Sequence, residues 1–256
     1  MKALRAAALA SLLTIGATGC GGGTASPAGS TPAGTVTVFA AASLTETFTT
    51  IGKQYESAHP GTRVSFNFAG SSALATQINQ GAPADVFASA APKNMATVTD
   101  AGNAAGAPVT FAKNQLVITV TKGNPKKIAG PADLSKPGLK VALCAEAVPC
   151  GAAAKTALEA AGVKLMPVTL EQDVKAALSK VKLGEVDASL VYRTDAKVAS
   201  ADVDAVEFPE SAKAVNEYPI VALKNAKNPA EAQGFIDYVR SADGTKVLTE
   251  AGFQAP

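Results

Sequence analysis

The sequence is poor in the side chains on which most enzyme and metal sites depend. It has a single histidine, His59, three cysteines and no tryptophan in 256 residues. Histidine is the commonest general base and a common metal ligand, so one copy leaves little material for either role. The sequence also lacks a G-x-S-x-G elbow, an H-E-x-x-H pair and a phosphate-binding P-loop. It therefore predicts a protein that is not an enzyme, needs no cofactor and has no metal site.

The sequence also lacks an excess of charge of either sign once its first segment is set aside. Lys2 and Arg5 belong to that segment, so 21 of the 23 basic residues remain, against 21 acidic ones. A nucleic-acid partner usually requires a basic face, and a neutral body argues against one. Aromatic residues are only 5% of the chain while hydrophobic residues are 47%, so alanine, valine and leucine must fill the core.

The first apolar run is too short to cross a membrane. It covers residues 6–17, and a spanning helix needs roughly 20 residues. Because it follows the charges of Lys2 and Arg5, it is typical of a secretory signal. We predict a signal peptide over residues 1–19 and export of the chain.

The end of this signal resembles a bacterial lipobox. The sequence Ala17-Thr18-Gly19-Cys20 would be cut before Cys20, whose thiol would then receive lipid. Ala17 replaces the usual leucine, and an ordinary signal with an incidental cysteine is the alternative. Residues 20–34 contain no large apolar side chain and are expected to form a flexible tether. The lipid on Cys20 would anchor the protein to the outer face of the cell membrane.

The body alternates short β-rich runs with amphipathic stretches. The pattern predicts strands at residues 35–40, 64–68, 85–88, 116–120, 139–143, 188–192 and 218–223. It predicts helices at residues 43–58, 71–80, 93–101, 151–161, 173–183, 229–240 and 242–250. Ser43 and Glu46 match a capping box, which makes Ser43 the expected N-cap of the first helix. Alternating strands and helices indicate an α/β fold with parallel sheets and crossover helices.

Small or hydroxyl residues connect several strands to the start of the next helix. They occur at residues 40–43, 70–72, 149–151 and 172–174. The unpaired N–H groups and the dipole at such a helix start favour an anion, and ligands usually bind at the carboxyl ends of parallel strands. A serine before a helix is usually only a cap, but the pattern recurs in both halves of the chain. The set therefore predicts an anion-binding site.

The same segments resemble those of a known family. Residues 38–44, 68–74, 81–87, 148–151, 171–174 and 190–196, with Gly252 and Phe253, are similar in order to periplasmic molybdate-binding proteins of ABC transport. The resemblance covers nearly all of the body. It implies a type II periplasmic-binding-protein fold, with two lobes, each a mostly parallel sheet flanked by helices, and a ligand cleft between them. Lobe 1 would be residues 35–114 and 218–256, and lobe 2 residues 115–217.

The resemblance also implies a set of ligand-binding residues. Ser43 and Ser71 would donate hydrogen bonds from lobe 1, the backbone N–H groups of Cys150 and Val174 from lobe 2, and Tyr192 through its hydroxyl. Ser72 is the alternative to Ser71, and Tyr192 could instead be an interior or rim aromatic. The family often has alanine where this chain has Cys150, a change that a backbone contact tolerates.

Molybdate suits such a shell of neutral donors. It is a fully deprotonated dianion at neutral pH, so it accepts hydrogen bonds and donates none; a carboxylate would repel it. Tungstate is nearly the same size, and exclusion of the smaller sulfate would depend on the cavity. We expect a monomeric binding protein that delivers molybdate, and tungstate with it, to the permease and ATPase of an ABC importer. The alternatives are a binding protein for another oxyanion such as sulfate, or an oxyanion-sensing surface protein.

Two cysteines remain beyond Cys20. Cys144 and Cys150 would lie outside the cytoplasm, where disulfides persist, and a bridge would hold the Cys150 turn beside the ligand. The alternative is a pair of free buried thiols. Asp85 and Asp195 are expected to be structural hydrogen-bonding residues rather than ligands.

Overall fold

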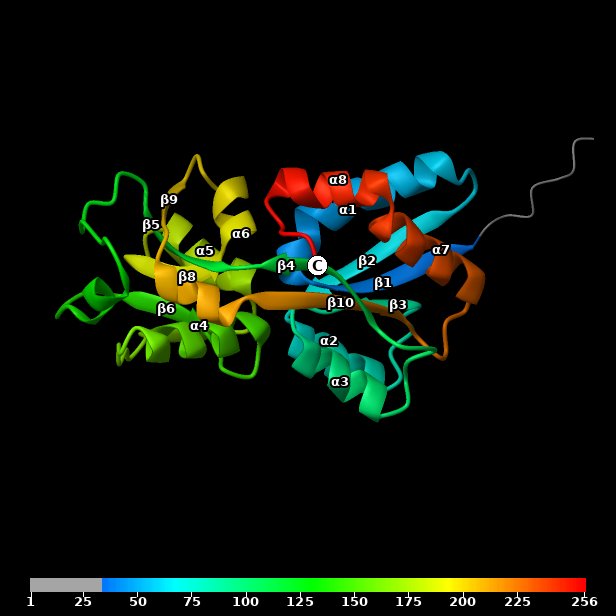
Figure 1. The fold of residues 1–256 in the computed structure, drawn as a ribbon, viewed down its shortest axis with the longest axis horizontal. Helices are drawn as coiled ribbons and strands as arrows, with labels where there is room; N and C mark the ends of the chain where they lie inside the picture. The colour runs from blue at the N-terminus through cyan, green and yellow to red at the C-terminus, as the bar shows by residue number, and fades with distance from the viewer. Residues whose placement is uncertain (1–33) are drawn as a thin grey trace, which may run out of the picture. The chain divides into compact units, whose positions relative to one another are not determined.

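The computed structural model describes residues 34–256, which form two five-stranded sheets (Figure 1). The predicted signal peptide, Cys20 and nearly all of the tether lie outside these residues. The first sheet has the order β2-β1-β3-β10-β4 and the second the order β7-β6-β8-β5-β9. The strands of the first sheet are β1 (Thr35–Ala41), β2 (Arg63–Ala69), β3 (Val86–Ala88), β4 (Val109–Asn114) and β10 (Asn216–Ala222). Those of the second are β5 (Leu116–Thr121), β6 (Val141–Cys144), β7 (Thr169–Glu171), β8 (Ala188–Tyr192) and β9 (Val203–Val206).

Helices cover both faces of the first sheet. On one face lie α1 (Thr45–Ala58), α7 (Pro229–Arg240) and α8 (Ala242–Ala251), and on the other α2 (Ser71–Asn79) and α3 (Pro92–Asp100) (Figure 1). Because side chains alternate along a strand, Val36 and Val38 of β1 pack with the first group of helices and Phe39 with the second. Phe48 of α1 fills the first core, with its ring 5.9 Å from that of Phe235.

The second sheet is covered by α4 (Pro149–Ala160) on one face and by α5 (Val174–Lys182) and α6 (Arg193–Val198) on the other (Figure 1). Its core consists mostly of alanine, valine and leucine, as the composition predicts. Short 3₁₀ helices complete the described elements: η1 (Ala42–Leu44), η2 (Pro131–Ser135) and η3 (Pro209–Ala214). No helix among residues 34–256 is long and apolar enough to span a membrane.

The chain passes between the sheets twice. Only Gln115 separates β4 from β5, and only Val215 separates η3 from β10. The two crossings touch, because the Gln115 side-chain amide donates a 2.7 Å hydrogen bond to the Ser211 hydroxyl.

The predicted α/β fold with two helix-flanked sheets is confirmed, but both sheets are mixed rather than mostly parallel. Four strand pairs are parallel, and the four antiparallel pairs all contain β5 or β10. These two strands enter their sheets directly from the other sheet. Without a preceding crossover helix, nothing forces them to run parallel to their neighbours.

The predicted capping box is wrong. Residues 42–44 form η1, and α1 begins at Thr45 with Leu44 as an N-cap that makes no side-chain hydrogen bond. The Ser43 side chain is turned inward, and Glu46 forms an ion pair with Lys175 instead of reaching back. Six other short elements were not predicted either: β4, β7, β9, α6, η2 and η3.

Candidate functional site

One cavity is lined by residues attached to both sheets. From the first sheet come Ala41, Ala42, Ser43, Gly70, Ser71 and Ala90, and from the second Val148, Pro149, Cys150, Asp173, Val174 and Tyr192. The cavity is small, with a volume of about 10 Å³. All five residues predicted to bind the ligand line this cavity, and each is no more than 3% exposed. Ser72 is half-buried and does not line it.

The cavity lies where strands end and helices begin. Ser71 is the first residue of α2, Cys150 the second of α4 and Val174 the first of α5, while Ser43 lies in η1 directly after β1. The first N–H groups of a helix have no acceptor within the helix. Backbone donors from three α-helix starts therefore surround the cavity, and each start adds the positive end of a helix dipole.

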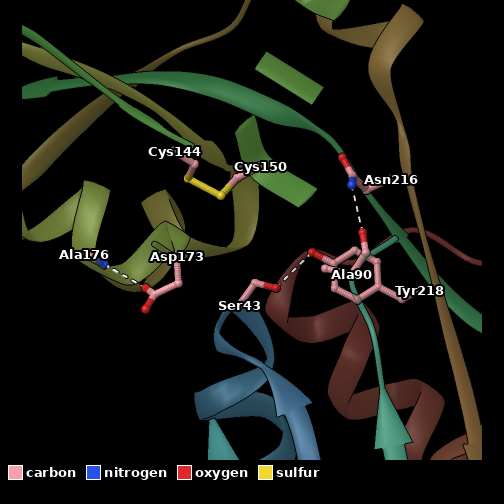
Figure 2. The surroundings of a disulfide bond; sticks show 8 residues. All are labelled: Ser43, Ala90, Cys144, Cys150, Asp173, Ala176, Asn216 and Tyr218. Atoms are coloured by element: carbon pink, nitrogen blue, oxygen red, sulfur yellow. Dashed lines mark hydrogen bonds between the residues drawn. A yellow bond between two sulfur atoms is a disulfide. The ribbon is translucent and has the colours of Figure 1, made fainter. Parts of the chain in front are cut away.

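Strand β10 supports both serines of the site, and Figure 2 shows the contacts of its Tyr218 and Asn216 with Ser43 and Ala90. The Tyr218 hydroxyl lies 2.9 Å from Ser43 Oγ, and both groups are buried. Two residues earlier on the same face of the strand, the Asn216 amide donates a 2.8 Å hydrogen bond to the Ala90 carbonyl. The Ala90 N–H in turn donates to Ser71 Oγ at 3.0 Å. Because Ser71 Oγ accepts this bond, its own hydrogen remains available to the cavity.

Tyr192 is the most distinctive donor. It is the last residue of β8, is 1% exposed, and its hydroxyl has no hydrogen-bond partner among the described residues. Burying an unpaired hydroxyl costs roughly 1–3 kcal/mol, so such a group is expected to serve a ligand. Burial raises the pKa of Tyr192 well above its ordinary value, which keeps the hydroxyl protonated and able to donate.

No lysine or arginine lines the cavity among the described residues. The nearest basic side chain in sequence is Lys175, which follows Val174. Its Nζ lies 2.8 Å from a carboxylate oxygen of Glu46 and 2.9 Å from one of Asp195, so its charge is already paired. Burial raises the pKa of Asp195 to about 6, although the neighbouring Lys175 opposes this shift.

One carboxylate does line the cavity, that of Asp173, which the sequence did not single out. It is the N-cap of α5, and its Oδ1 accepts a 2.9 Å hydrogen bond from the Ala176 N–H (Figure 2). The capping bond gives the carboxylate a structural role. Val174 follows Asp173 as the first residue of α5, so its N–H has no acceptor within the helix.

A disulfide joins Cys144 and Cys150, with an S–S distance of 2.08 Å (Figure 2). It links the end of β6 to the first turn of α4 and closes the intervening loop beside the cavity. Gly151 allows the loop to pack this tightly, because a Cβ there would lie 2.0 Å from the Ala145 carbonyl oxygen. The bridge and the glycine together fix the position of the Cys150 N–H.

Asp85 and Asp195, which the sequence predicts to be structural, do not line the cavity. Asp85 accepts backbone hydrogen bonds from Thr37 at 2.7 Å and Lys227 at 2.6 Å, and so joins three segments of the first sheet. Residues 34–256 contain no group of three or more His, Cys, Asp or Glu side chains placed to hold a metal ion.

Comparison with known proteins places the chain in a family. The model of the family described as bacterial extracellular solute-binding protein matches residues 36–254. The molybdate-binding protein ModA of Mycobacterium tuberculosis is 47% identical over 251 residues, 97% of this chain and 96% of that protein. Among solved structures, the periplasmic molybdate-binding protein of Azotobacter vinelandii has a TM-score of 0.77 at 21% identity, covering 86% of this chain and 99% of that one. The sulfate-binding protein SubI of M. tuberculosis has a TM-score of 0.74 at 18% identity, covering 86% of each chain.

The family model covers nearly the whole described body, so the chain belongs to the bacterial extracellular solute-binding proteins. Within that family it is similar along almost its full length to the molybdate-binding proteins named ModA, which confirms the resemblance predicted from the sequence motifs. These proteins bind solutes outside the cytoplasm and are not enzymes.

Proposed function

We propose that the chain captures molybdate outside the cytoplasm, and tungstate with it, and delivers the anion to an ABC importer. One observation carries the proposal: hydroxyl and helix-start N–H donors attached to two sheets line one buried cavity without a basic side chain. The relatives named as molybdate-binding proteins support the same ligand.

The proposed donors are Ser43, Ser71, Cys150, Val174 and Tyr192, the last through its unpartnered hydroxyl. A fully deprotonated tetrahedral dianion accepts bonds from all of them and needs no acceptor in return. Hydrogen phosphate carries a proton that would need an acceptor, and the lining offers a single carboxylate, that of Asp173, whose Oδ1 already accepts the capping bond of α5. The donor set therefore favours molybdate, tungstate or sulfate over phosphate.

We further propose that the two sheets are the cores of two lobes, residues 35–114 with 218–256, and residues 115–217. The lobes would move about the crossings at Gln115 and Val215 and close around the anion. The importer's permease and ATPase would then recognise the closed form, so that only a loaded protein delivers its ligand.

We also propose that the protein is a monomer held at the outer face of the membrane by lipid on Cys20. The signal predicted over residues 1–19 would direct export, and the tether predicted over residues 20–34 would link the lipid to the body. Globomycin blocks lipoprotein signal cleavage. We expect it to cause accumulation of the unprocessed chain, and normal processing in its presence would favour an ordinary secretory signal.

Titration calorimetry with molybdate, tungstate, sulfate and phosphate tests the ligand. We expect one anion per chain for molybdate and tungstate, weaker binding of sulfate and no heat with phosphate. Absence of heat with both molybdate and tungstate would refute the proposal, and tighter binding of sulfate would select the sulfate alternative. The Ser43→Ala variant is expected to weaken binding, because it removes one donor.

A further inference from the structure

Gly70 lies at a close contact between the two halves of the cavity. It follows β2 of the first sheet and directly precedes Ser71. A Cβ at this position would lie 2.3 Å from the carbonyl oxygen of Gln172 and 3.3 Å from Val148 Cγ1. Gln172 and Val148 both belong to segments of the second sheet that lead into cavity residues. The backbones of the two halves therefore touch at Gly70, and no side chain fits between them.

The local backbone does not require glycine at this position. Gly70 has φ −59° and ψ 135°, a conformation that any residue adopts. It is the N-cap of α2, where serine is at least as favourable as glycine. The close approach to Gln172, and not the helix that Gly70 begins, is what excludes a side chain.

We infer that Gly70 is a positioning residue whose missing side chain lets the cavity close on its anion; this inference rests on the proposed function. Gly70 precedes Ser71, and Gln172 lies two residues before Val174. Their contact therefore sets the separation between a donor of one half and a donor of the other. A tetrahedral anion only a few ångströms across can bind both donors only at the closed separation.

The size of the effect follows from the contact distance. Ordinary van der Waals contact begins at 3.4 Å, so a Cβ that meets Gln172 O at 2.3 Å would hold the segments about 1 Å further apart. N–H···O hydrogen bonds span about 2.7–3.2 Å, so a displacement of this size removes donors of one half from bonding distance. Losing one bond to a charged group weakens affinity roughly 10- to 100-fold.

The test uses the full body of the protein with Gly70→Ser, Gly70→Ala and a control, Gly106→Ser. A Cβ at Gly106 would meet nothing within 4 Å, and Gly106 has no left-handed backbone. Calorimetry with molybdate gives the affinity, small-angle X-ray scattering gives the contraction on saturation, and thermal unfolding without ligand gives the stability.

Gly70→Ser is expected to unfold without ligand at a temperature no lower than wild type, but to bind molybdate about 10- to 100-fold more weakly and to contract less. Gly70→Ala should weaken binding similarly, and Gly106→Ser should match wild type in every measurement. Wild-type affinity in Gly70→Ser would overturn the inference. So would a Gly70→Ser chain that fails to fold, because the glycine would then serve the fold. Failure of the wild-type chain itself to bind molybdate would overturn the proposed function instead.

Discussion

Replacing Tyr192 by phenylalanine separates ligand binding from stability. The substitution removes a single oxygen atom from a side chain that is 1% exposed and keeps the ring that packs 6.0 Å from the ring of Tyr218. The Tyr192 hydroxyl has no partner among the described residues, so its removal breaks no internal hydrogen bond. Because burying the unpaired hydroxyl is itself unfavourable by roughly 1–3 kcal/mol, we expect the free energy of unfolding without ligand to stay the same or to rise by up to about this amount.

Binding should respond much more strongly. If the hydroxyl donates to the anion, its loss removes a hydrogen bond to a charged acceptor, worth about 1.5–3 kcal/mol. The dissociation constant for molybdate is then expected to rise roughly 10- to 100-fold. Calorimetry measures this change directly, and denaturant unfolding without ligand measures the change in stability.

The same substitution at two other tyrosines provides the controls for Tyr192→Phe. Tyr218→Phe removes a buried hydrogen bond to Ser43, so it should lower stability by about 1–3 kcal/mol as well as weaken binding. Tyr55→Phe alters a buried tyrosine whose hydroxyl contacts Glu231 rather than the cavity, and should leave affinity unchanged. An unchanged affinity in Tyr192→Phe, or a loss of stability as large as that of Tyr218→Phe, would show that Tyr192 is only an interior aromatic.

Three further expectations follow from the site. Replacing Cys144 and Cys150 by serine removes a loop constraint over a sequence separation of 6 residues. The free energy of unfolding should then fall by about 2 kcal/mol, and molybdate should bind more weakly. Added reductant should lower the stability and the affinity of wild type but not those of the variant. Ser71→Ala should weaken binding while Ser72→Ala, outside the cavity, should not; equal effects in calorimetry would contradict the choice of Ser71. Burial raises the pKa of Asp195 from 3.8 to about 6. Between these two pH values the Asp195 carboxyl is protonated in the folded chain but ionised in the unfolded chain, so the free energy of unfolding should fall as the pH rises from about 4 to about 6. Asp195→Asn should flatten the slope of unfolding temperature against pH, and an unchanged slope would show that another group causes it.

Much of the fold was predictable from local patterns. The helices α1, α7 and α8 and the strands β1, β5 and β8 have a clear apolar period, and the structure places them within a few residues of their expected positions. Strands β7 and β9 contain only three and four residues, too few to show a period. The antiparallel direction of β5 and β10 depends on how the chain passes between the sheets, which no local pattern encodes.

In the candidate site too, features that depend on neighbouring residues were predictable, and features that depend on contacts between distant parts of the chain were not. The five predicted ligand residues lie in motifs of four to seven consecutive residues, which is why resemblance could identify them. Tyr218 could not be identified in this way, because its contact with Ser43 joins residues 175 positions apart. Gly70 occurs within a recognised motif, but its importance depends on the carbonyl oxygen of Gln172, in a different part of the chain.

The capping-box error has a similar cause. Ser43 and Glu46 satisfy the local signature, and in an isolated helix the reciprocal bonds would be favourable. In the folded chain both side chains have distant partners, Tyr218 for Ser43 and Lys175 for Glu46. Tertiary contacts at a cavity therefore displaced the local preference, and a rule that is broken at such a place indicates function.

A neutral body that binds a dianion must rely on geometry more than on net charge. The donors are N–H groups at helix starts and hydroxyls, and the nearby Lys175 is already paired with two carboxylates. Neutral donors stabilise an anion only when they all point at it, and their combined effect falls quickly with distance. This requirement explains why rigid features hold the donors beside the cavity: the Cys144–Cys150 bridge and the tight packing at Gly151. Under the proposed opening of the lobes, a separation of about 1 Å would take the donors out of bonding distance, and it would also stretch the ion pair between Lys175 and Glu46, which joins the two halves.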